Sequence, residues 1–109
     1  MTVKELLSLL PIKPLSLPDA EREVEGVYMG DLLSWVMGRA KANQALVTIM
    51  TNVNVVAVAS LLDLSLVVMC DGAMPDEDVI LTANAKEVNM ASFEGSVYEL
   101  CSAFAKLGL

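Results

Sequence analysis

The chain contains no histidine and only two cysteines among its 109 residues. Without histidine it can form neither a Ser-His-Asp nor a Cys-His catalytic system, and every histidine-containing zinc site is excluded. Cys70 and Cys101 do not follow a Cys-x-x-Cys or zinc-ligand spacing. Both fall in apolar patterns, so we interpret them as buried free thiols of a protein that works in the reducing cytoplasm.

Glycine-rich nucleotide motifs are also missing. The six glycines are isolated, so the chain has neither a P-loop nor a dinucleotide-binding fingerprint. The acids from Asp76 to Asp78 lack the spacing of a calcium loop and are typical of a solvated helix start. We therefore predict no enzymatic activity, no cofactor and no metal. An enzyme with Cys70 as its nucleophile is an alternative, disfavoured because apolar surroundings raise the pKa of a thiol.

Positive charge is scarce, with 7 Lys and Arg against 14 Asp and Glu and a net charge of −7. Nucleic acids are excluded as partners because phosphate binding requires clustered cations. The longest apolar stretch, Val53 to Cys70, is interrupted by Asn54 and Asp63, so it does not predict a membrane span. The first turns contain Lys4 and Glu5 and do not resemble a signal peptide.

What the chain has in excess is apolar side chains, which make up 55% of it and are concentrated between Leu46 and Gly72. Polar residues interrupt this segment where a strand–helix–strand unit would turn, which predicts strands at 45–50 and 64–69 and a helix at 54–62. Two parallel strands need such a crossover. The segment therefore indicates an α/β fold with a mostly parallel sheet.

The flanking sequence fits one domain spanning residues 1–109. Thr2 and Glu5 have the spacing of a capping box for a first helix, and Pro14 and Pro18 indicate an edge strand. Asp31 is a suitable N-cap for a helix that follows a strand at 24–29. Further elements are expected as a helix from Pro75, a strand at 88–91 and a helix at 94–107.

The helix at 54–62 is apolar on all sides and is expected to pack both on its own sheet and on a partner. A second copy of the chain is the simplest partner, so we predict a homodimer. The predicted interface residues are Val55, Val56, Val58, Ala59 and Leu62.

Ligands of parallel sheets bind outside the carboxyl ends of the strands. A small anionic metabolite or a nucleotide could bind there. The candidate ligand-binding residues are Gly30, Asp31, Thr51, Asn52, Asn54, Asp71 and Gly72. The alternative is that they only form helix caps and turns, which favour the same residue types. Trp35 and Tyr28 could stack on a base, or they pack in the core or a dimer interface.

Four segments together resemble the DRTGG-domain family, and the resemblance runs over essentially the whole chain. They are Val27 to Ser34, Thr51-Asn52, Val56 to Leu61, and Asp71-Gly72 to Pro75-Asp76. The chain is similar to stand-alone relatives of the N-terminal domain of bacterial HPr serine kinase/phosphorylase. It departs from the family name, since it reads Met69-Cys70-Asp71-Gly72 and nowhere Asp-Arg-Thr-Gly-Gly.

The resemblance implies a three-layer α/β/α sandwich that is often dimeric and serves as a regulatory module beside kinases, phosphotransacetylases and CBS domains. The sequence lacks the P-loop of the kinase half. Two hypotheses follow. The first is a non-enzymatic regulatory or interaction module that acts as a homodimer. The second is a sensor that binds a nucleotide or sugar phosphate at the carboxyl ends of the strands.

Overall fold

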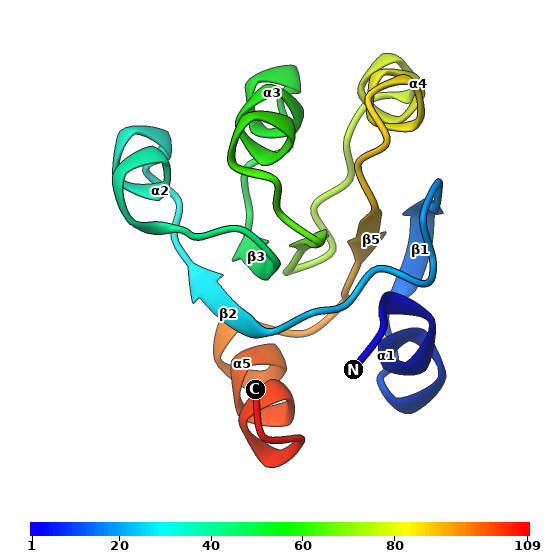
Figure 1. Ribbon diagram of the computed structural model, residues 1–109, viewed down its shortest axis with the longest axis vertical. Coiled ribbons are helices and arrows are strands. Elements are labelled where there is room, and N and C mark those ends of the chain that lie inside the picture. The colour runs from blue at the N-terminus through cyan, green and yellow to red at the C-terminus, as the bar shows by residue number, and fades with distance from the viewer.

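Five strands form one sheet in the order β1-β5-β4-β3-β2 in the computed structural model, which describes all 109 residues (Figure 1). Strands β2 to β5 are parallel to one another, and only β1 is antiparallel to its neighbour β5. The elements are α1 (Val3–Leu9), β1 (Lys13–Ser16), β2 (Gly26–Met29), α2 (Leu33–Arg39), β3 (Gln44–Thr48), α3 (Val53–Leu62), β4 (Leu66–Met69), α4 (Glu77–Ala85), β5 (Met90–Ser92) and α5 (Val97–Lys106).

Helices cover both faces of the sheet. Figure 1 shows α2, α3 and α4 side by side on one face and α1 and α5 on the other. Each face has its own apolar cluster: Leu46 and Val67 point towards the three-helix side, whereas Val47 and Val68 point towards α1 and α5. The alternation along β3 and β4 follows from the two-residue period of a strand. The expected three-layer α/β/α sandwich with a mostly parallel sheet is confirmed.

Local signals in the sequence explain most element boundaries. Thr2 and Glu5 form the expected capping box of α1, and the helix ends before Pro11. Ser96 and Glu99 form a second capping box at the start of α5, which the sequence analysis did not identify although the Ser-x-x-Glu spacing is present. None of the helices has the length and apolar character that crossing a membrane requires.

Helix α3 is confirmed, but its environment differs from the expectation. It lies between α2 and α4 in the three-helix layer (Figure 1), so most of its apolar surface is enclosed within the monomer. Of the predicted interface residues, Val55, Val56, Val58 and Ala59 are buried in the core, and Leu62 is half-buried. These residues therefore belong to the core of the monomer and not to its free surface. The outer face of α3 presents Val53, Ala57 and Leu61.

Candidate functional site

The residues predicted to bind a ligand lie in three turns at the carboxyl end of the sheet. Gly30 and Asp31 follow β2, and Asp71 and Gly72 follow β4. Thr51 and Asn52 follow β3, and Asn54 lies in the first turn of α3. Because these three strands are parallel and adjacent, their carboxyl ends lie at the same edge. The topology thus brings the predicted turns to one end of the sheet.

Asp31 links two of these turns. It does not cap α2, so the predicted N-cap is wrong. Its Oδ1 accepts hydrogen bonds from the Thr48 hydroxyl and the Ile49 N–H, both at 2.9 Å. The N-cap of α2 is Leu32, which makes no side-chain cap. The carboxylate is drawn to the end of β3 because the buried Thr48 hydroxyl needs an acceptor. Asp31 therefore has a structural role: it joins the turn after β2 to the end of β3.

Asn52 also has a structural partner. Its Oδ1 accepts the N–H of Asn54 at 3.0 Å, which makes it the N-cap of α3 as expected. The Asn54 side chain is exposed, and Thr51 is half-buried with no side-chain hydrogen bond. Of the polar side chains after β3, those of Thr51 and Asn54 are the ones left without a partner in the chain.

The turn after β4 is held by its backbone. Asp71 and Gly72 have positive φ angles of 58° and 68°, a conformation that glycine and aspartate tolerate better than most residues. Their N–H groups donate to the carbonyls of Gly95 at 2.8 Å and Phe93 at 3.1 Å. A side chain at Gly72 would also approach the Glu94 carboxylate to 3.3 Å. This turn is shaped by the segment that follows β5.

Both thiols are held in their protonated form. Burial, together with smaller contributions from the nearby Cys101, Asp71 and Asp31, raises the pKa of Cys70 to about 12. Burial also raises the pKa of Cys101, whose Sγ lies 3.7 Å from the sulfur of Met29. A nucleophilic cysteine needs the opposite shift. The structure also contains no group of three or more acidic or cysteine side chains that could hold a metal ion.

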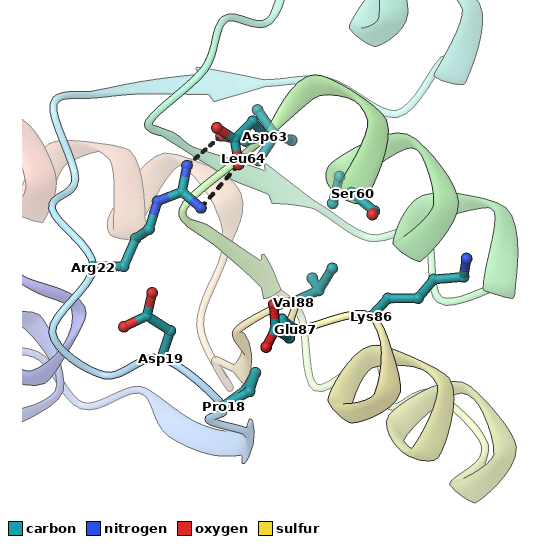
Figure 2. A pocket seen from close by; sticks show the side chains of 10 residues that line it. Pro18, Asp19, Arg22, Ser60, Asp63, Leu64, Lys86, Glu87 and Val88 are labelled. Carbon is teal, nitrogen blue, oxygen red and sulfur yellow. Dashed lines mark hydrogen bonds and ion pairs between the residues drawn. The ribbon is translucent and has the colours of Figure 1, made fainter.

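The one cavity of the molecule lies at the other end of the sheet, where α3 and α4 end and β4 and β5 begin. It encloses about 350 Å³ and is lined mainly by polar side chains (Figure 2). The lining residues are Pro18, Asp19, Arg22, Ala59, Ser60, Asp63, Leu64, Lys86, Glu87 and Val88. None of the predicted ligand-binding residues contributes to it.

Arg22 forms one wall of this cavity but is not free to bind a ligand. Its guanidinium pairs with the Asp63 carboxylate at 3.0 Å and donates to the Asp63 carbonyl at 2.7 Å (Figure 2). A further bond goes to the Asn43 side chain at 2.9 Å. The charges left without an ion pair are those of Asp19, Lys86 and Glu87. This cavity was not predictable from the sequence because its walls come from segments far apart in the chain.

Comparison with known proteins is informative at the level of fold. No family model and no curated protein matches the sequence. Among solved structures, the chain is similar to the CBS and DRTGG domains of the regulatory region of Clostridium perfringens pyrophosphatase, solved in complex with its activator, diadenosine tetraphosphate. The TM-score is 0.73 at 10% identity, over 94% of this chain and 45% of that one, so this chain spans less than half of that region. The likeness shows a DRTGG-like α/β fold shared with part of a regulatory protein.

Proposed function

We propose that this protein is a regulatory module that acts by binding, without catalysis, and that it functions as a homodimer in the bacterial cytoplasm. On this proposal residues 1–109 are one DRTGG-like domain, related to the N-terminal domain of HPr serine kinase/phosphorylase. The observation that carries it is the fold shared with a regulatory region over 94% of the chain. The protonated thiols and the internal bonds of Asp31 and Asn52 support a role without catalysis.

The homodimer is supported by the apolar side chains that remain exposed. Met29 is 57% exposed, Trp35 54% and Tyr98 80%. Side chains of this size in contact with water favour association when they lie close together. Sedimentation equilibrium at micromolar concentration tests this part of the proposal. We expect twice the chain mass of 11.7 kDa, and a protein that remains at 11.7 kDa would contradict it.

A second candidate is a small-molecule sensor, and the cavity at the amino ends of β4 and β5 favours it. A volume of about 350 Å³ lies within the range of roughly 300–1,000 Å³ that small-molecule sites occupy. The carboxyl-end turns with Thr51 and Asn52 remain the alternative position for an anionic metabolite or nucleotide. The structural relative was solved with a nucleotide activator, so nucleotides belong in the ligand panel.

Thermal shift with nucleotides and sugar phosphates tests the sensor and locates its site. We expect a ligand to raise the melting temperature of the wild type. Lys86→Ala would abolish that shift for a ligand in the cavity, whereas Asn52→Ala would abolish it for one at the carboxyl end. Asn52→Asp is the matched control for the loss of the α3 cap, because aspartate also caps helices. If no ligand shifts the melting temperature at millimolar concentration, the sensor hypothesis is wrong.

A further inference from the structure

Strand β2 is an open edge of the sheet, in contrast to β1 at the other edge. The β1 edge contains Lys13 and Pro14 and is followed by Pro18, which is how native sheets discourage pairing. Strand β2 contains neither lysine nor proline and pairs only with β3. Figure 1 shows it at one side of the sheet, between the levels of α2 and α5.

The free hydrogen-bonding groups of β2 can be assigned to residues. The Gly30 N–H donates to the Val47 carbonyl of β3 at 3.1 Å. Because successive residues of a strand point their N–H and C=O groups to opposite sides, those of Val27 and Met29 point away from β3. They form a short row of donors and acceptors that another extended backbone would satisfy.

Helix α2 places an aromatic side chain beside this row. Val36 and Ala40 are buried, and α3 lies on one flank of the helix. In a right-handed crossover from β2 to β3, the residue just before Val36 lies on the opposite flank, above the open edge. That residue is Trp35, which is 54% exposed, and the Arg39 guanidinium lies 3.7 Å from its ring centroid.

Apolar groups also flank the edge on the other face of the sheet. Met29 is 57% exposed and its sulfur lies 3.7 Å from Cys101 of α5. Tyr98 precedes Cys101 by three residues, so it lies on a neighbouring part of the same helix surface, and it is 80% exposed. The open strand is thus bordered by large exposed side chains above and below.

We propose that a second copy of this chain pairs its β2 with this strand in antiparallel orientation, so that the sheet continues across a two-fold axis. Such an edge is self-complementary, since each copy offers the same donors and acceptors in reverse order. This inference rests on the proposed homodimer and names its surface, which we call the β2 edge: Val27, Met29, Trp35, Arg39 and Tyr98.

Charge complementarity favours a second copy as the occupant. Asp31 is exposed just before α2, whereas Arg39 lies in its last turn and Lys41 follows. Antiparallel pairing of the β2 strands brings the Asp31 end of one α2 next to the Arg39 end of the other. Glu25 lies at the same end as Arg39 and Lys41, which leaves that end with a net positive charge. The helix dipoles also run in opposite directions in this arrangement.

Two variants of exposed residues test the β2 edge in the full chain. Met29→Lys places a charge on the strand, and Arg39→Glu sets like charges opposite one another across the axis. Leu61→Lys is the control, because Leu61 is also an exposed apolar residue but lies on the outer face of α3. We expect both edge variants to raise the dimer dissociation constant by about tenfold or more. The control should leave it unchanged, and all three should keep the wild-type far-UV circular dichroism.

The single tryptophan gives an independent reading of the same surface. On dilution through the dissociation constant, Trp35 should become solvated and its emission should shift to the red. A wild-type dimer that is insensitive to both edge variants, or one that Leu61→Lys dissociates, would overturn the β2 edge while leaving the homodimer intact. A monomeric wild type would overturn the homodimer and the β2 edge together.

Discussion

Removing the Asp31 carboxylate should destabilise the protein by about 2 kcal/mol. In Asp31→Ala the Thr48 hydroxyl, which is completely buried, loses its acceptor, and an orphaned buried donor costs about 1–3 kcal/mol. The Ile49 N–H also loses its partner, but Ile49 is 47% exposed and water can replace the bond. The larger part of the effect therefore comes from Thr48.

Urea denaturation of three variants separates this network from a helix cap. Asp31→Asn keeps an acceptor at the same reach and should retain at least half of the stability that Asp31→Ala loses. Asp31→Ser would be tolerated if residue 31 capped α2, because serine is a good N-cap. Its side chain is too short to reach Thr48 and Ile49, so we expect it to match alanine. A change below about 0.5 kcal/mol for Asp31→Ala would refute the reasoning.

Three further predictions concern buried or capped groups. Asn89 is 2% exposed, and its side chain accepts the Asp19 N–H and donates to the carbonyls of Asp19 and Ser65. Asn89→Ala should therefore lower the free energy of unfolding in urea by about 2–4 kcal/mol. A decrease below about 1 kcal/mol would contradict this. Cys70, with a thiol pKa of about 12, should resist alkylation at neutral pH until the protein is unfolded. Rapid alkylation of Cys70 in the native state, detected by mass spectrometry, would contradict its burial. Hydrogen bonds within the Ser96 capping box lower the pKa of Glu99, so its contribution to stability is complete above the ordinary carboxyl pKa and is lost as the pH falls through the lowered value. Glu99→Gln should therefore weaken the acid dependence of stability measured by circular dichroism, and an unchanged pH profile would argue against the capping box.

Features that depend on neighbouring residues were predictable from the sequence. The capping box at Thr2, the N-cap at Asn52 and the strand–helix–strand unit around α3 all appear as expected. Each depends on residues within a few positions of one another or on the need of parallel strands for a crossover. The carboxyl-end location of the polar turns follows from the same topology.

Features that depend on distant residues were not predictable. The partner of Asp31 lies 17 positions away, and Arg22 meets Asp63 across 41 positions, so neither the network at β3 nor the cavity wall has a local signal. The burial of α3 was misjudged because a helix in the middle of a three-helix layer encloses most of its circumference within one monomer. Trp35, expected to pack in the core or an interface or to stack on a base, is exposed beside Arg39.

The central claim is that this protein is an interaction module that acts as a homodimer. Sedimentation equilibrium of the full chain at micromolar concentration tests this claim most directly. We expect a species of twice the 11.7 kDa chain mass. A species that stays at 11.7 kDa across the concentration range would contradict it.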